Sequence, residues 1–536
     1  MGVLLIFIYP MQPLFSGNQN IYFLWAMENL IPNAFSADPL LSAPDPYPLF
    51  SWLISILPVQ FLEVWTTGIY VILCSIYSYS LFGIGDIFGK IYENPKRLLS
   101  FSSLFLVLHA SAIWGTFISL QSEFDLRWIW DSGIAEQGVL RGYLQPSVWG
   151  VFLLLSIYHA SKKNYSAAIL WIAPAAIIHA NYLFLGAILT IIYLGLSRLD
   201  KRSIMAAVIL LVLVSPYTIY TLNHFLLLGD EMNAAISNAV AETYETSIHL
   251  NPKNWLCPKF YLQLALLFTA SLLVWRSRLK QLFLAILFSC VALTILAYAL
   301  GSTTLISLNP WRLTVILIPI SSVILLAKLI RSSRWKNLQL LIVLTVGLIC
   351  AATVYFRILG NGSTEFMEAW KTVSFVGFIA VIFFDWFLSK KASPSVVTTI
   401  ELLMIFALVV SGFTESYIEK KTKDSQSQFA ATSALKTAQE PNTLYVIPSD
   451  WTSFRLNAEK AVYVDENLVY GAVLPGINQR IKEVKSATSN GNYTSVLSSI
   501  PTGLAVKLIA PSNSKIAGAI SEVQLTENYS CYLLRE

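Results

Sequence analysis

The stretch that decides the fold is residues 162–202, which read KKNYSAAILWIAPAAIIHANYLFLGAILTIIYLGLSRLDKR. Between the basic residues at its two ends, positions 165–197 are apolar and are interrupted only at His179-Ala180-Asn181. A membrane-spanning helix needs about 20 residues. A single helix of about 33 residues, at 1.5 Å each, would overshoot the bilayer. The stretch therefore predicts two spanning helices with a turn at His179.

The composition of the whole chain extends this interpretation. Of 536 residues, 55% are hydrophobic and only 12% are charged, whereas a soluble domain carries about 25% charged residues. Most of the chain must therefore face lipid. Apolar runs predict an all-α polytopic bundle of thirteen spans, at 2–15, 63–84, 98–120, 146–161, 165–178, 181–197, 203–222, 260–275, 281–300, 311–330, 337–356, 368–388 and 397–413.

The connections between these spans differ in basic charge. One side holds 17 lysines and arginines: Lys90, Lys96, Arg97, Lys162, Lys163, Arg198, Lys201, Arg202, Arg276, Arg278, Lys280, Lys328, Arg331, Arg334, Lys336, Lys390 and Lys391. The other side holds seven: Arg127, Arg141, Lys253, Lys259, Arg312, Arg357 and Lys371. Because basic residues collect in cytoplasmic loops, we expect a cytoplasmic N-terminus and an extracytoplasmic C-terminus.

Two domains are expected. Residues 1–413 form the transmembrane domain, with outer loops at 16–60, 121–145 and 223–257, and residues 414–536 form a small extracytoplasmic α/β domain. In the first loop, Leu24, Met27, Ile31 and Phe35 recur at helical spacing, which predicts a helix lying in the membrane interface.

The hydrophilic tail predicts a small sheet. Short buried strands are expected at Thr443–Ile447, Ala461–Val464 and Gly503–Ile509, a hairpin at Glu522–Leu534, and helix within 476–499.

No motif of a soluble enzyme is present: there is no Walker sequence, GxSxG, HExxH or GxGxxG opening a helix. The remaining candidates are polar and ionisable residues at the outer ends of spans. Such groups are costly in a membrane and are therefore functional candidates.

Asp38 follows the predicted interfacial helix and faces the outer mouth of the bundle. A carboxylate there can act as a general base on an acceptor hydroxyl, orient the acceptor, or bind a metal. The alternative is a helix N-cap, because Asp before Pro39 is a common helix start. Asp45 is a second candidate for substrate binding, although the proline-rich turn 44–48 explains it fully, which favours Asp38 over Asp45 for a catalytic role.

The loop 121–145 offers further polar candidates. Arg141 at the bilayer surface can clamp a phosphate, and Glu123, Asp125 and Gln145 are candidates for substrate binding. The alternative is a solvated loop with internal ion pairs.

Two more candidates lie at span ends. Arg312 opens a span from the outside and either snorkels to head groups or holds a lipid-linked phosphate. His179 lies at the predicted helix break, and such breaks often mark binding sites in membrane proteins. The alternative for His179 is a packed, hydrogen-bonded residue.

Several segments together resemble the GT-C superfamily of integral membrane glycosyltransferases, most closely a bacterial branch of that group. The matching segments are Gly17-Asn18-Gln19-Asn20, Asp38, Pro44-Asp45-Pro46-Tyr47-Pro48, Gln145-Pro146, His179, Asn309-Pro310-Trp311-Arg312, Ile447-Pro448-Ser449-Asp450, Phe454-Arg455 and Val462-Tyr463-Val464-Asp465. The order of one span, a long outer loop with an acid, many spans and a terminal α/β domain also resembles these enzymes.

This resemblance implies a function. The chain would move a sugar from a polyprenyl-phosphate donor to an extracytoplasmic glycan, lipid or protein at the bacterial inner membrane. Asp38 would be the essential acid of the first loop, and Arg312 and Arg141 would hold the donor phosphate. No metal ligand is assigned, although a divalent metal is an alternative. The competing hypotheses are a transporter or flippase of lipid or polysaccharide, and a catalytically silent relative.

Overall fold

The structure, a computed structural model, describes residues 1–9, 12–110, 129–226, 249–302, 305–306, 308–331, 402, 405–406, 408–409, 432–436, 440–448, 451, 453–464, 477–512, 514, 516 and 519–535. The expected spans at 337–356 and 368–388, and most of the one at 397–413, lie outside these residues.

The regular secondary structure of the described residues before 332 consists of helices joined by loops. They are α1 (Gly2–Ile8), α2 (Gln19–Tyr22), α3 (Leu24–Leu30), η1 (Pro39–Ser42), α4 (Pro48–Ile54), η2 (Val59–Phe61), α5 (Leu62–Gly89), η3 (Ile91–Glu93), α6 (Pro95–His109), η5 (Pro146–Gly150), α7 (Val151–Ser161), α8 (Tyr165–Leu170), α9 (Ala173–Ile178), α10 (Ala180–Leu196), α11 (Lys201–Thr221), η6 (Leu222–Leu226), η7 (Pro252–Trp255), α13 (Pro258–Val274), α14 (Lys280–Ala299), η8 (Pro310–Leu313) and α16 (Thr314–Arg331).

Four helical segments among the described residues are long and apolar enough to cross a membrane: Val59–Gly89, Lys201–His224, Lys280–Ala299 and Pro310–Arg331. They correspond to the spans expected at 63–84, 203–222, 281–300 and 311–330. The helix expected at 2–15 is wrong in length, since α1 has only seven residues and is too short to cross a bilayer. The number of thirteen spans stays a prediction.

The break predicted at His179 is confirmed. Helix α9 ends at Ile178, and His179 caps α10 by accepting a hydrogen bond of 3.2 Å from the backbone N–H of Asn181. The expected span 165–178 is itself divided into α8 and α9, which was not predicted. Pro174, which has no N–H to donate, stands in the first turn of α9 and favours a new helix start there.

The helix predicted in the first loop is present as α3 but its setting differs from the expectation. Leu24 and Met27 are buried against protein, as is Phe35 beyond the helix end. The apolar stripe that suggested an interfacial helix therefore packs into the protein core. Periodicity reports which face is apolar and does not report what covers that face.

The tail contains the predicted small sheet, whose strands are partly parallel and partly antiparallel. The described residues from 440 to 535 are called the C-terminal unit. Its elements are β1 (Thr443–Val446), α21 (Phe454–Ala458), β2 (Ala461–Val462), α22 (Ile477–Asn490), α23 (Thr494–Ser499), β3 (Ala505–Pro511), β4 (Ser521–Gln524) and β5 (Tyr529–Arg535).

The strand order is β2-β1-β3-β5-β4, so β2 and β4 are the edges. Strand β1 runs parallel to β2 and β3, with Leu444 opposite Ala461 and Val506. Strand β5 runs antiparallel to β3 and β4, and the predicted hairpin at Glu522–Leu534 is confirmed.

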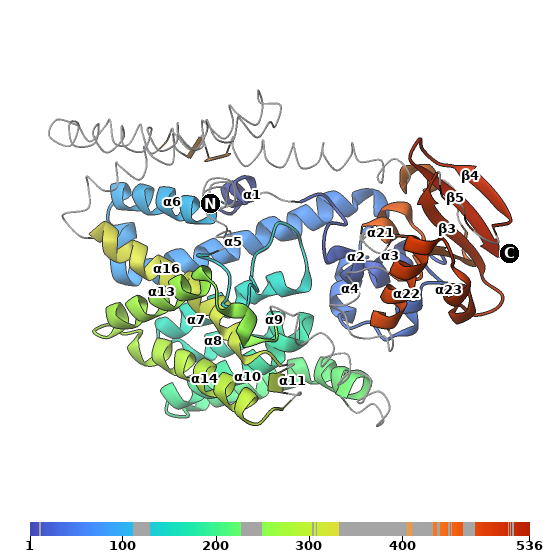
Figure 1. Cartoon of the computed structure of the whole chain (residues 1–536). Helices are drawn as coiled ribbons and strands as arrows, with labels where there is room; N and C mark the ends of the chain where they lie inside the picture. Colours follow the sequence, from blue (N-terminus) through green and yellow to red (C-terminus); the bar gives the residue numbers. More distant parts are fainter. Residues whose placement is uncertain are drawn as a thin grey trace.

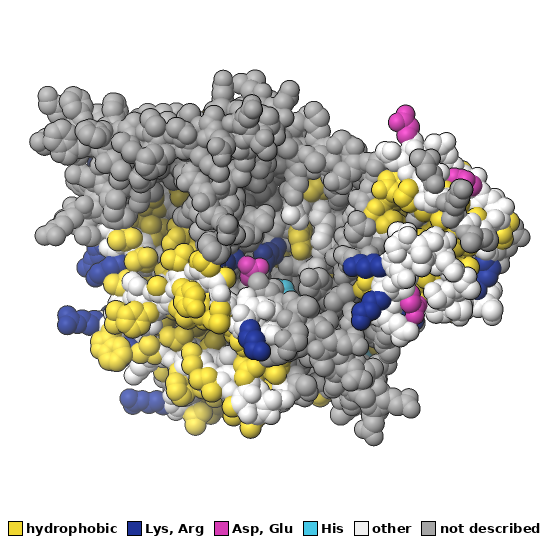
Figure 2. Space-filling model, viewed as in Figure 1, with side chains coloured by type: hydrophobic (Ala, Val, Ile, Leu, Met, Phe, Trp, Pro, Cys, Tyr) yellow, Lys and Arg dark blue, Asp and Glu magenta, His cyan; other side chains and the backbone are white. Residues whose placement is uncertain are grey.

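Figure 1 shows the C-terminal unit beside α2–α4, at the far end of the molecule from α13 and α14. Large hydrophobic side chains are exposed on the helices; Phe268 on α13 and Phe288 on α14 are 66% and 74% exposed. Hydrophobic surface is prominent over this region in Figure 2. Exposed apolar helix surface of this kind belongs in lipid, so the chain is a membrane protein.

Candidate functional site

The described part of the second outer loop, residues 129–145, folds into the helix bundle and is not a solvated loop. Asp131 and Gln137 are only 2% and 8% exposed. A tight turn holds the loop: the N–H of Gly133 donates to the carbonyl of Gln137 at 2.6 Å, and Ser132 bridges to Gly138. The alternative of a solvated loop is therefore wrong for these residues. Glu123 and Asp125 lie outside the described residues.

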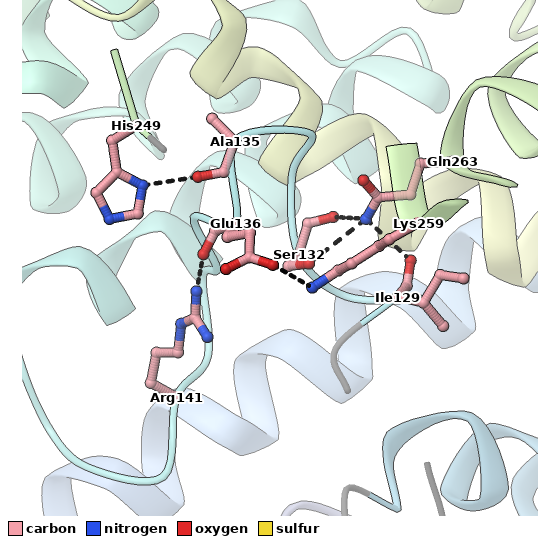
Figure 3. Close-up of polar contacts among 8 residues, drawn as sticks. All are labelled: Ile129, Ser132, Ala135, Glu136, Arg141, His249, Lys259 and Gln263. Atoms are coloured by element: carbon pink, nitrogen blue, oxygen red, sulfur yellow. Dashed lines mark hydrogen bonds and ion pairs between the residues drawn. The ribbon is translucent and has the colours of Figure 1, made fainter. Parts of the chain in front are cut away.

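Helix α13 fixes this loop with two buried side chains (Figure 3). The Nε2 of Gln263 donates to the carbonyl of Ser132 at 2.9 Å and to that of Ile129 at 3.2 Å. The Nζ of Lys259, which is 4% exposed, lies 3.5 Å from an Oε1 of Glu136. Charged groups are tolerated at such burial when they are paired. The loop is thus held rigidly against the bundle.

Arg141, a predicted phosphate ligand, is held by the same loop. Its Nη2 donates to the carbonyl of Glu136, and its own carbonyl accepts from the hydroxyl of Tyr70. The phosphate-binding role of Arg141 stays a prediction, with part of the guanidinium already used inside the loop.

Arg312 reaches the loop from η8, the 3-10 turn that opens α16. Asn309 adopts the left-handed conformation (φ 52°, ψ 59°) and Pro310 begins the turn. The Nε of Arg312 donates to the Oε1 of Gln137 at 2.9 Å. Its Nη1 is buried and has no hydrogen-bond partner among the residues that the structure describes. A buried cationic donor without an acceptor is costly, so this atom is the clearest candidate for contact with a ligand.

Aromatic and imidazole side chains from three other segments share the electrostatic environment of Arg312, whose positive charge acts on Tyr22, Tyr47, His179 and Tyr182. The ring of Tyr47 lies 5.1 Å from that of Tyr22 and 5.3 Å from that of His179, which lies 4.9 Å from that of Tyr182. These five residues are called the Arg312 cluster below. His179 is therefore both a helix cap and a member of this cluster.

The cluster offers donors to an anion. Burial raises the pKa of Tyr22 and Tyr47 above the ordinary phenol value, and the guanidinium of Arg312 only partly opposes this. Both phenols are therefore neutral O–H groups at physiological pH, able to donate hydrogen bonds. A guanidinium with neutral phenols and an imidazole suits a phosphate.

Asp45 lies next to this cluster in sequence and in space. Its Oδ1 accepts from the N–H of Tyr47 at 2.8 Å, and its carbonyl accepts from the hydroxyl of Tyr220 at 2.7 Å. Burial raises the pKa of the Asp45 carboxyl above the usual aspartate range, although the hydrogen bond from the N–H of Tyr47 opposes this. A carboxylate with a raised pKa can act as a general base.

Asp38 is placed differently. Its Oδ1 accepts from the N–H of Leu40 at 3.0 Å, which confirms the N-cap. Its Oδ2 accepts from the Nε of Arg455 at 2.7 Å and from the N–H of Val462 at 3.0 Å, and both charged side chains are 0% exposed. The ion pair with Arg455 was not predicted, because sequence periodicity does not pair residues 417 positions apart.

Two further expectations concern Gln145 and a metal. Gln145 is 6% exposed and precedes η5; its role in substrate binding stays a prediction. Within the described ranges, no group of three or more His, Cys, Asp or Glu side chains is arranged to hold a metal ion. The oxygens of Asp38 already accept from a guanidinium and two amides, which does not fit a metal ligand.

One solved structure shares this fold over nearly the whole chain. The crystal structure of ArnT from Cupriavidus metallidurans bound to undecaprenyl phosphate superposes with a TM-score of 0.52, at 14% identity, over 99% of this chain and 96% of that one. The apo structure of the same protein gives 0.49 at 13% identity, over 99% and 95%. No protein-family model and no curated protein sequence matches the chain. The comparison therefore shows that this chain has the fold of ArnT over nearly its whole length.

Proposed function

We propose that this chain is a membrane glycosyltransferase that takes a sugar from a polyprenyl-phosphate donor and transfers it to an acceptor outside the cytoplasm. The fold supports this class, since the ArnT structure that shares it is bound to undecaprenyl phosphate, a lipid phosphate of the kind that the GT-C resemblance implies for the donor. At 14% identity the fold alone does not carry the function to this chain. The proposal therefore depends on the geometry of the candidate site.

The observation that carries the proposal is the buried Nη1 of Arg312, which has no acceptor among the described residues. A phosphate oxygen would complete its hydrogen bonding and neutralise its charge. Such charge-assisted hydrogen bonds contribute roughly 1.5–3 kcal/mol. The donor's phosphate would therefore lie in the Arg312 cluster, with its lipid tail among the apolar helices.

The reaction assigns roles to the same residues. The acceptor hydroxyl attacks the anomeric carbon, the bond from that carbon to the phosphate oxygen breaks, and the lipid phosphate leaves with the electron pair. Arg312 stabilises the negative charge that grows on the leaving phosphate. A carboxylate accepts the proton of the hydroxyl. Asp38 is the sequence-based candidate for that base, and the geometry adds Asp45, which makes no ion pair among the described residues.

Binding of undecaprenyl phosphate to the purified protein tests the phosphate site. We expect Arg312→Ala to weaken binding by roughly 10- to 100-fold, the equivalent of the lost hydrogen bonds. Arg331→Ala is the matched control, because Arg331 ends the same helix on its opposite, exposed end. Undecaprenol, which lacks the phosphate, should bind equally to wild type and to Arg312→Ala. Equal binding of undecaprenyl phosphate to all three proteins would contradict the proposal.

A further inference from the structure

One edge of the C-terminal sheet, strand β2, is covered by the side chain of Asp38 from the first outer loop. Among the described residues, strand β2 pairs with β1 and with no other strand. The N–H of Tyr463, just past β2, donates to the carbonyl of Tyr445 on β1 at 2.9 Å. The N–H of Val462 instead donates to the Oδ2 of Asp38 at 3.0 Å. An edge strand exposes such unpaired groups, and here Asp38 takes the place of a neighbouring strand.

A second bond reinforces this contact. The Nε of Arg455, on the short helix α21, lies 2.7 Å from the same oxygen, and neither charged side chain is exposed. Nearby, the hydroxyl of Ser36 donates to the carbonyl of Pro441 at 2.6 Å. Removing one member of a buried ion pair leaves the other charge uncompensated. The C-terminal unit thus holds the first loop at Asp38 through both an ion pair and a backbone hydrogen bond.

The segment that follows Asp38 is stiff. Between Asp38 and α4 the chain carries three prolines, at positions 39, 44 and 46, and a fourth, Pro48, begins α4. Each proline fixes its own φ and restricts the residue before it. The Oδ1 of Asp38 also caps the turn η1. Few backbone torsions are left to absorb a displacement between the two ends of this segment.

The other end of the segment is the candidate site. Asp45 and Tyr47 lie within it, and the ring of Tyr47 contacts those of Tyr22 and His179 in the Arg312 cluster. A movement of Asp38 would therefore be transmitted to the residues that face the donor phosphate.

We propose that Arg455 is a positioning residue. Through its ion pair with Asp38 it holds residues 38–48 in place, so that Tyr47 stays in contact with the other members of the Arg312 cluster and Asp45 stays beside them. The benefit to donor binding rests on the proposed function. The link from Arg455 through Asp38 to residues 38–48 does not depend on it. The docking of the C-terminal unit would then set the geometry of the donor site.

Hydrogen exchange measured by mass spectrometry on the full-length protein in lipid nanodiscs tests the link. We expect Arg455→Met to speed exchange at least tenfold in peptides covering 38–50, where the N–H groups of Leu40 and Tyr47 are held by Asp38 and Asp45. Arg455→Lys, which keeps the charge, should restore much of the protection. Lys436→Met is the matched control, since Lys436 forms a surface ion pair of 3.0 Å with Glu459 in the same part of the chain.

The outcomes separate the positioning role of Arg455 from the proposed glycosyltransferase function. Wild-type exchange of 38–50 in Arg455→Met, or an equal increase in Lys436→Met, would overturn the positioning role. If Arg455→Met does not fold, the double variant Asp38→Asn/Arg455→Met removes both charges of the pair and strands neither, and unchanged exchange of 38–50 in that variant overturns the proposal instead. Where a sugar donor is turned over, Arg455→Met should lower kcat at least tenfold more than it raises KM. A protein without transfer activity leaves the exchange result standing.

Discussion

Arg312 and Gln137 are joined by a hydrogen bond of 2.9 Å although 175 positions separate them in the chain. The bond occupies the Nε of the guanidinium and fixes the plane of the group. It leaves Nη1 buried, without an acceptor among the described residues. An arginine that is oriented before the ligand arrives loses less entropy when it binds a phosphate.

Gln137→Glu should therefore weaken the binding of undecaprenyl phosphate. The new carboxylate would pair with Arg312 and compete with the ligand for its charge, so we expect a loss of at least about tenfold, equivalent to ~1.4 kcal/mol. Gln137→Ala should cost less, because it removes only the orienting bond. Gln479→Glu on the exposed helix α22 controls for the added charge. A variant Gln137→Glu that binds as tightly as wild type would show that the phosphate lies elsewhere.

The two aspartates of the first loop, Asp38 and Asp45, should separate stability from catalysis. Asp38→Asn strands the buried charge of Arg455, so we expect a loss of about 3–5 kcal/mol of unfolding free energy, well above the ~1 kcal/mol of a simple cap. Asp45→Asn strands no paired charge and, because burial disfavours the ionised Asp45 carboxyl, should not lose stability at neutral pH. The general base is identified by which variant, once folded, loses roughly 10²–10⁴-fold in transfer rate. Thermal unfolding and transfer assays on both variants measure this, and full activity in both would refute a catalytic aspartate in this loop.

The raised pKa of Asp45 predicts a pH dependence of stability. Its folded-state pKa lies above the unfolded value of about 3.9, so the folded state binds more protons between the two values. Wild-type stability should fall as pH rises through that window, and the deficit should persist above it. The Tm of Asp45→Asn relative to wild type should accordingly rise with pH from about 4 upward.

Asp200 provides a control of opposite sign. Hydrogen bonds from Ser203 lower the pKa of its carboxyl, so its contribution is present above the unfolded pKa and is lost as pH falls. Asp200→Asn should therefore lose stability relative to wild type at neutral pH. A pH-independent difference between Asp45→Asn and wild type would mean that this carboxyl is solvated.

The topology follows from the imbalance of 17 against seven basic residues in the connections. Reporter fusions at Lys162 and at the C-terminus should report opposite sides of the membrane, with Lys162 in the cytoplasm. The same side for both fusions would be incompatible with the predicted arrangement of spans.

Local patterns predicted much of the fold. The helix break at His179 and each strand of the tail follow from hydrophobic periodicity and turn residues, which act over a few positions. The division of 165–178 into α8 and α9 could have been anticipated from Pro174, since proline often begins a helix. The setting of α3 could not, because an apolar stripe fits a lipid surface and a protein core equally well.

The site was predicted less completely, for a physical reason. Arg312, Asp45 and His179 were found because polar residues at span ends are costly and therefore few. Their partners Gln137, Tyr22 and Tyr182 carry no such signal, and only folding brings them together. The same holds for Arg455: a buried arginine is unusual, but nothing in its neighbourhood along the chain identifies Asp38 as its partner.

The most direct test of the central claim is sugar release and transfer by purified wild type and Arg312→Ala, with a panel of polyprenyl-phosphate sugars as donors. We predict that at least one donor is turned over by wild type, and that Arg312→Ala loses roughly tenfold or more in kcat/KM for it while Arg331→Ala retains the wild-type value. Absence of transfer with every donor would contradict the account and favour a transporter or a silent relative. Equal turnover by wild type and Arg312→Ala would contradict the proposed phosphate site.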